Sequence, residues 1–144
     1  MASLKDGIVI NTTSEKLWPF LTTPDLIRKW LEGIEFVSTK GNYPEVGSSF
    51  EWAYKVAGLA LKGTNTVAEL VPGQAIHYKV QGLLTGTQNW DISQAGGGVR
   101  VDVDNEYELG GGVLGKVAEP LVHQSNAATL KKSLANLKQQ AESS

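Results

Sequence analysis

Hydrophobic and polar residues alternate with a period of two through much of the segment from residue 34 to residue 109, which is typical of β-strands with one buried face. The clearest case is segment 99–109, where valine, asparagine, tyrosine and leucine alternate with charged residues. Runs of glycine, proline and asparagine break the pattern, as turns between strands do. The expected strands are residues 5–11, 34–39, 49–56, 61–71, 75–80, 85–93 and 99–109.

Two short helices are expected between the first and second of these strands. Residues 12–15, Thr-Thr-Ser-Glu, have the pattern of a capping box, and Pro19 is expected to kink or shorten the helix that follows. Thr23 and Pro24 fit the N-cap and first position of a second helix, which Gly33 should end. The side chains expected on the buried faces are Leu17, Trp18, Phe20, Leu21, Leu26, Ile27, Trp30 and Leu31.

The last part of the chain has the spacing of a helix. Residues 113–141 favour one long helix with a kink at Pro120, about 40 Å long at ~1.5 Å per residue, which matches strands of about 33 Å. Going back along its buried stripe reaches Ala127 and His123, where smaller or polar side chains leave more room. The stripe that anchors the second half is Leu130, Leu134, Leu137 and Ala141.

The order of these elements predicts the architecture. A sheet with one aromatic-rich face needs a cover, and the long helix is almost the only segment left to supply it. The sheet is therefore expected to curl around the helix in an α+β fold, leaving an internal apolar cavity beside residues 113–127. No repeat, low-complexity tract or linker interrupts the sequence, so residues 1–144 are expected to form one domain.

The inward-facing positions supply candidate cavity residues. Trp30, Leu121 and Ala127 are candidates from the helices, and His123 would join three amides as the polar groups that orient a ligand. The alternative is that the amides bond one another, the backbone or water, and that Trp30 only anchors the short helices on the sheet. The amides are Asn65, Gln88 and Asn105, and the aromatic wall is Phe36, Phe50, Trp52, Tyr54, Tyr78, Trp90 and Tyr107.

Composition narrows the range of functions. The 13 Lys and Arg against 15 Asp and Glu leave a net charge of −2, so a nucleic-acid partner is not expected. The sequence has no cysteine, which excludes disulfides and thiolate metal sites, and no run approaches the ~20 apolar residues of a membrane span. A soluble, cytoplasmic protein is therefore expected. No cofactor or metal is expected either. The acidic residues stand in line on one face of a strand, with no loop to wrap a cation, and are Asp102, Asp104, Glu106 and Glu108.

Several short motifs follow one another in a specific order along the chain. They are Ser14–Trp18, Thr23–Leu31, Val46-Gly47, Glu69–Gly73, Tyr107–Lys116 and Leu134–Lys138. On these residues the chain resembles the START-like, Bet v 1-like (SRPBCC) superfamily, and within it the polyketide cyclase/dehydrase and lipid transport group. The resemblance spans nearly the whole chain. It implies a helix-grip fold, in which a seven-stranded antiparallel sheet, with two short helices between its first two strands, grips the C-terminal helix over a cavity.

Two functions are compatible with both the residues and the resemblance. The first is binding or transport of a small hydrophobic ligand that is lipid-, quinone-, polyketide- or aromatic-like. The second is a cyclase/dehydratase-type enzyme acting on a polyketide-like or aromatic substrate, in which His123 or Tyr107 moves a proton.

Two weaker hypotheses stay open beside them. One is a module that binds a protein partner through its outer surface, although no extended patch is evident in the sequence. The other is a weak anion site at Gly110–Gly112, because these glycines precede a helix. Whichever function applies, we expect the protein to be a monomer or a weak homodimer.

Overall fold

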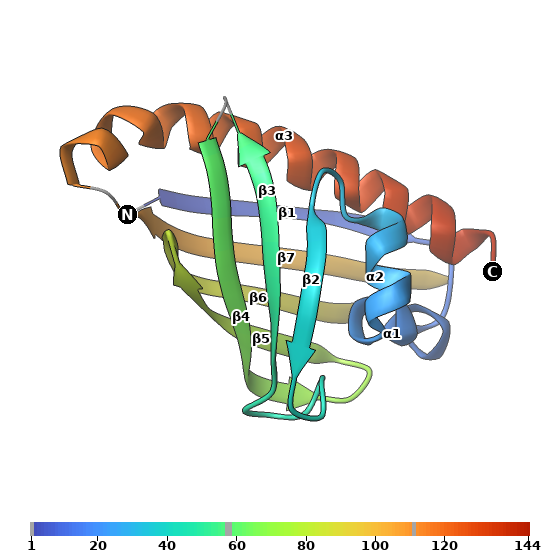
Figure 1. Cartoon of the computed structure of the whole chain (residues 1–144). Coiled ribbons are helices and arrows are strands. Elements are labelled where there is room, and N and C mark those ends of the chain that lie inside the picture. Colours follow the sequence, from blue (N-terminus) through green and yellow to red (C-terminus); the bar gives the residue numbers. More distant parts are fainter. Residues whose placement is uncertain (1, 57–58, 111) are drawn as a thin grey trace.

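Seven antiparallel strands form a curved sheet around a long C-terminal helix in this computed structural model (Figure 1). The structure describes residues 2–56, 59–110 and 112–144, and the side chains of these residues except 35–37, 54–56, 59 and 112–118. The strands are β1 Ala2–Ile10, β2 Glu35–Lys40, β3 Ser49–Val56, β4 Leu59–Val71, β5 Ala75–Gly82, β6 Leu84–Ala95 and β7 Gly98–Leu109. The helices are α1 Ser14–Thr22, α2 Pro24–Trp30 and α3 Gly112–Glu142. The expected helix-grip fold is confirmed.

The strand order of the sheet is β1-β7-β6-β5-β4-β3-β2, so the first strand lies beside the last. The period-two pattern of β7 correctly gives its buried face: Val101, Val103 and Tyr107 are each at most 5% exposed. β1 begins at Ala2, earlier than expected, because it pairs with β7 as far as Tyr107. All seven strands therefore belong to one sheet, with β1 and β2 at its two edges.

The two short helices begin and end close to the expected residues. Thr13 is the N-cap of α1, and its hydroxyl accepts a hydrogen bond from the backbone N–H of Lys16 at 3.2 Å. α1 ends at Thr22, soon after Pro19, and Pro24 occupies the first turn of α2 as expected. Gly33 follows with a φ of 70°, a conformation that suits glycine. These helices close one end of the curved sheet (Figure 1).

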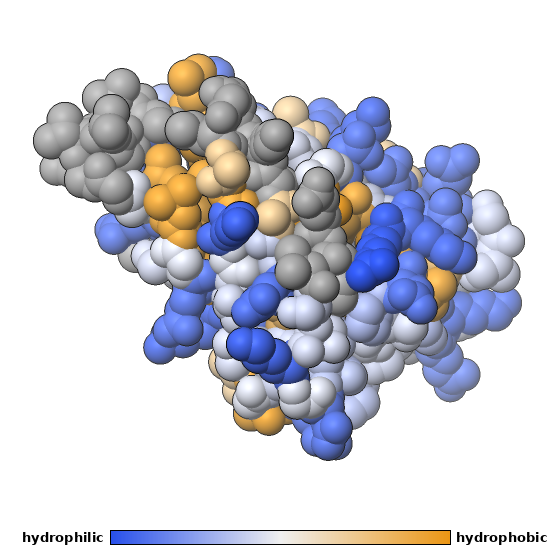
Figure 2. Space-filling view, viewed as in Figure 1, coloured by the Kyte–Doolittle hydropathy of each residue, from blue (hydrophilic) through white to orange (hydrophobic). Residues whose placement is uncertain are grey.

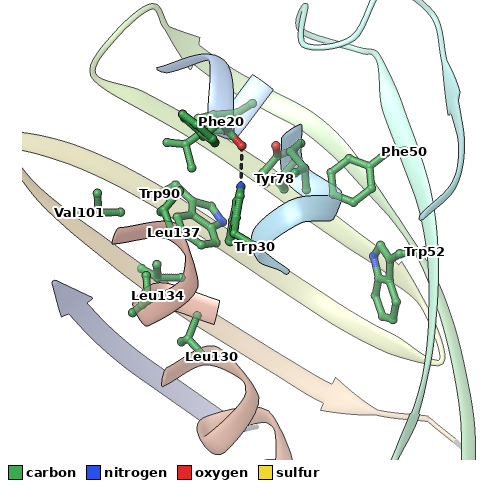
Figure 3. Close-up of a cluster of buried hydrophobic side chains, with 14 of the residues drawn as sticks. Phe20, Trp30, Phe50, Trp52, Tyr78, Trp90, Val101, Leu130, Leu134 and Leu137 are labelled. Carbon is green, nitrogen blue, oxygen red and sulfur yellow. Dashed lines mark hydrogen bonds between the residues drawn. The ribbon is translucent and has the colours of Figure 1, made fainter. Parts of the chain in front are cut away.

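Trp30 anchors α2 in the core. Its indole Nε1–H donates to the backbone carbonyl of Phe20 at 2.7 Å, and its ring meets Trp90 edge-on with centroids 5.3 Å apart. Figure 3 shows these rings beside Leu134 and Leu137 of α3, while Phe50 and Trp52 lie on the far side of the group. Large side chains therefore fill the half of the domain under α1 and α2.

α3 runs along β1 over the open side of the sheet (Figure 1). The expected anchoring stripe is confirmed, since all four side chains are buried. In the first half the expected stripe is less deeply buried. Among its described side chains Val122 is fully buried, whereas His123 and Ala127 are partly buried and Leu121 is 57% exposed. Figure 2 shows apolar and polar residues mixed on the face in view. Among the described residues, no helix is long and apolar enough to cross a membrane.

Candidate ligand-binding cavity

A cavity of about 120 Å³ lies between the sheet and α3, next to the filled half of the core. Its aromatic wall comes from four of the expected residues, Phe50, Trp52, Trp90 and Tyr107. The three expected amides, Asn65, Gln88 and Asn105, also line it. The period of two thus places the correct strand residues on the inner face, because adjacent side chains on a strand point to opposite sides.

The remaining expected residues lie elsewhere. Trp30 and Tyr78 line an adjoining recess of about 30 Å³ beneath the short helices. Neither Ala127 nor Leu121 is among the described lining residues, and Leu121 is 57% exposed. The side chains of Phe36 and Tyr54, and Gly111 of the anion site considered at Gly110–Gly112, fall outside the described residues.

Sequence reasoning did not name three helix residues that line the cavity. They lie around the middle of α3, beside Leu130 of the anchoring stripe, and are Asn126, Thr129 and Ser133. The signal was present in the sequence, since these residues follow the spacing of three and four that marks one helix face. Their polar character hid it, because Asn, Thr and Ser are more often found on the solvent face.

The loop between α2 and β2 forms another missed part of the wall. Leu31 and Ile34 line the cavity from this loop. Three hydrogen bonds tie the loop and the end of α2 to α3. The backbone N–H of Glu32 donates to the Ser133 hydroxyl at 3.0 Å, and Asn136 Nδ2 donates to the Trp30 carbonyl and to Glu32 Oε2, each at 3.2 Å. The loop is therefore fixed over the cavity by helix side chains that lie far away in sequence.

A chain of hydrogen bonds joins two of the amides to the two indoles of the cavity. Trp52 Nε1–H donates to Asn65 Oδ1 at 2.8 Å, and Trp90 Nε1–H donates to Gln88 Oε1 at 3.0 Å. Asn65 Nδ2 donates to the same Gln88 oxygen at 3.4 Å. The amides thus bond each other and their neighbours, which holds both rings in place and satisfies polar groups in a buried setting.

Asn105 differs from the other two amides. It faces Gln88 across the β6–β7 pair, yet its Oδ1 is buried and has no hydrogen-bond partner among the described residues. Buried polar atoms are nearly always bonded. Asn105 Oδ1 is therefore a buried acceptor that the described residues leave without a partner.

Tyr107 connects the cavity to the outside through His123. Its hydroxyl shares a hydrogen bond of 2.9 Å with His123 Nδ1, and the histidine is partly exposed beside Glu119 and Pro120. Burial raises the pKa of the Tyr107 phenol, a hydrogen bond with Asn126 opposes that shift, and the nearby charge of Glu119 adds to it. Tyr107 is therefore a neutral phenol at physiological pH.

The acidic row on the outside of β7 forms surface ion pairs. Asp102 Oδ1 lies 2.9 Å from Arg100 Nε, and Asp104 Oδ2 lies 3.7 Å from Lys5 Nζ. Within the described part of the chain, no group of three or more His, Cys, Asp or Glu residues is arranged to hold a metal ion.

Fold and cavity together define a helix-grip domain of the START-like, Bet v 1-like superfamily. More specifically, residues 1–142 match the family described as polyketide cyclase / dehydrase and lipid transport, and the chain belongs to that family. No curated protein matches the sequence.

Solved structures share this fold at low sequence identity. TTHA0849 from Thermus thermophilus is 16% identical with a TM-score of 0.80, and the match covers 97% of each chain. Ara h 8.0201 is 13% identical with a TM-score of 0.73, and the match covers 99% of each chain. Aha1 from Colwellia psychrerythraea, solved as a dimer, is 16% identical with a TM-score of 0.59 over 92% of this chain and 94% of that one. At these identities the likeness concerns the fold alone.

Proposed function

We propose that this protein binds and carries a small hydrophobic ligand in the cavity between the sheet and α3. The observation that carries the proposal is the cavity itself, about 120 Å³ of space that is partly open to solvent, with aromatic and aliphatic walls and a few polar groups. Small-molecule sites have this composition, and internal cavities of about 150 Å³ with apolar walls take up benzene. The membership of a family that includes lipid transport in its description supports the same function.

The hydrogen-bonded indoles add a second line of support. Trp52 and Trp90 are each held by an amide, so the wall keeps its shape without a ligand. A site that is already formed loses less conformational entropy when a ligand binds. We infer a cytoplasmic location because the sequence contains no cysteine. We also propose that the carrier is a monomer or a weak dimer.

Thermal unfolding with a panel of apolar ligands tests the proposal. A ligand at about 100 times its Kd stabilises the folded state by about 2.7 kcal/mol, which raises the Tm of a domain of this size by roughly 5–10 °C. Thr129→Phe places a ring inside the cavity and should abolish the shift, whereas Ala128→Phe, at an exposed position next to it, should retain it. Lack of a shift with aromatic, quinone and lipid ligands would reject the proposal, as would an equal response of the two variants.

The Tyr107–His123 pair supports an enzyme of the cyclase/dehydratase type as a second candidate. Tyr107 presents its hydroxyl at the cavity wall and contacts a histidine that reaches the surface, so a proton has a path between the cavity and solvent. A neutral phenol suits the role of a hydrogen-bond donor or general acid towards a carbonyl oxygen. Turnover of polyketide-like or aromatic substrates by the wild type, lost in Tyr107→Phe, would support this candidate, and an unchanged rate would remove Tyr107 from the chemistry.

A further inference from the structure

We propose that the loop of residues 31–34, between α2 and β2, is a lid over the cavity. Polar side chains of α3 hold it closed, and a ligand enters and leaves when it opens. The lid rests on the proposed binding function, because it controls access to the same cavity. Three features of the loop carry the proposal: the side chains it places in the cavity wall, the polar contacts that hold it, and the open space on its outer side.

The loop separates the cavity from the outside of the domain. Leu31 and Ile34 line the cavity, and Leu31 also lines the adjoining recess beneath the short helices. Both side chains are partly buried and Gly33 between them is exposed, so the other side of the loop borders solvent. Outward movement of these four residues would therefore widen the way into both spaces.

Polar contacts between Glu32 and α3, which we call the latch, hold the loop beside the helix (Figure 1). The Glu32 N–H donates to the Ser133 hydroxyl at 3.0 Å, and Glu32 Oε2 accepts from Asn136 Nδ2 at 3.2 Å. Glu32 Oε1 also lies 3.7 Å from Lys132 Nζ, and both of these side chains are exposed. Such contacts contribute little net free energy, because water replaces the partner when they break. The latch can therefore open while the domain stays folded.

The loop has fixed ends and a free outer side. Before it, the Trp30 indole is buried and bonded to the Phe20 carbonyl. After it, the backbone of Glu35 pairs with Ala53 in the sheet. Between these ends, a Cβ at Gly33 would meet nothing within 4 Å. Outward movement at Gly33 therefore displaces no other described part of the chain, and the fixed ends confine the movement to the lid.

The competing explanation is that the loop is a fixed part of the wall and that a ligand uses the opening the cavity already has. The two explanations differ in their kinetics. With a lid, weakening the latch raises the rates of entry and exit together and leaves the Kd almost unchanged, because free and bound protein are both closed for most of the time. With a fixed wall, the same change leaves the rates through the existing opening as they were.

The first experiment weakens the latch and follows toluene binding to the full-length protein. Line shapes of the Trp52 and Trp90 indole N–H signals during an NMR titration give the Kd and the rates of entry and exit. Asn136→Ala removes the hydrogen bonds to the Trp30 carbonyl and to Glu32. It should raise both rates about tenfold and keep the Kd within about twofold of the wild type. Gln139→Ala, at an exposed position further along α3, is the matched control and should exchange toluene at the wild-type rate.

The second experiment locks the lid with a reversible cross-link. Glu32→Cys and Lys132→Cys together place two thiols where the charged ends of the side chains now lie 3.7 Å apart, and the sequence has no cysteine to compete with them. A bis-maleimide with a disulfide in its spacer ties the loop to α3, and dithiothreitol then cuts the spacer. The locked protein should exchange toluene about tenfold more slowly, or slower still, than the same protein after the cut.

Each outcome has a separate meaning. If toluene binds but its exchange rates are equal in wild type and Asn136→Ala and are unchanged by the cut, the lid is overturned and the binding function stands. A changed Kd with unchanged rates in Asn136→Ala also overturns the lid, because the latch then only supports the wall. If toluene moves neither indole signal in any of these proteins, the binding function fails and the lid fails with it. The comparison before and after the cut decides the matter should Asn136→Ala not fold, since Glu32 and Lys132 both have exposed side chains.

Discussion

Replacing Gly63 with alanine tests whether the cavity wall is as closely packed as the structure shows. Gly63 lies opposite Trp52 on the neighbouring strand, and a Cβ at residue 63 would stand 2.9 Å from both Cε2 and Cη2 of the indole and still nearer to Cζ2. Carbon atoms in contact lie ~3.5–4.0 Å apart, so the ring has to move by about 1 Å. That movement draws Nε1 away from Asn65 Oδ1, which it now contacts at 2.8 Å.

The magnitude follows from these two effects. Extra volume in a packed interior costs about 1–3 kcal/mol, and weakening a hydrogen bond to a buried carbonyl costs about 1–3 kcal/mol. Alanine recovers about 0.5–1 kcal/mol relative to glycine within a strand. The expected net loss in the free energy of unfolding is therefore about 1–5 kcal/mol.

Urea unfolding measures this loss, and the Trp52 indole N–H signal reports the ring. Gly97→Ala is the matched control, since a Cβ there meets nothing within 4 Å, and it should change stability by less than about 0.5 kcal/mol. If Gly63→Ala unfolds at the same urea concentration as Gly97→Ala and leaves the Trp52 signal in place, the close contact between Gly63 and Trp52 is refuted.

Two further predictions concern the rest of the fold. Leu134→Ala should lower the free energy of unfolding by about 2–5 kcal/mol, because Leu134 is 2% exposed. Leu121→Ala, at a position that is 57% exposed, should lower it by less than about 0.5 kcal/mol. Similar urea midpoints for the two variants would contradict the assigned face of α3. Burial raises the pKa of Tyr43 to about 12, against a hydrogen bond with Tyr78 that lowers it. The unfolded chain therefore ionises this tyrosine first, so stability should be level below about pH 10 and fall between about pH 10 and 12. Tyr43→Phe should make that fall shallower, and equal slopes would show that Tyr43 is not responsible.

The strand residues of the cavity were predictable from the sequence because their orientation is a local property. Alternation along a strand places Asn65, Gln88 and Asn105 on one face whatever their neighbours are. Their bonding is not local. Whether an amide meets an indole or remains unpaired depends on the register between strands, as in the diagonal contact of Asn65 with Gln88, and no spacing within one strand contains that information.

The helix was predictable in extent but only in part in orientation. The leucines around Leu134 mark the buried row clearly because large apolar side chains have few other places to go. In the middle of α3 the inward row includes Asn126, Thr129 and Ser133, whose polar side chains bond other elements or border a cavity. A pattern of hydrophobic residues cannot mark a face that borders empty space, so the sequence did not identify these three residues as part of the cavity wall.

The central claim is that a small apolar molecule occupies the space between the sheet and α3. Intermolecular NOEs between toluene and the assigned wild-type protein test it most directly. The account predicts NOEs from toluene to the indole protons of Trp52 and Trp90 and to the methyl groups of Thr129 and Leu130, which surround the cavity. NOEs confined to exposed side chains such as Leu121, or none at all at millimolar toluene, would contradict it.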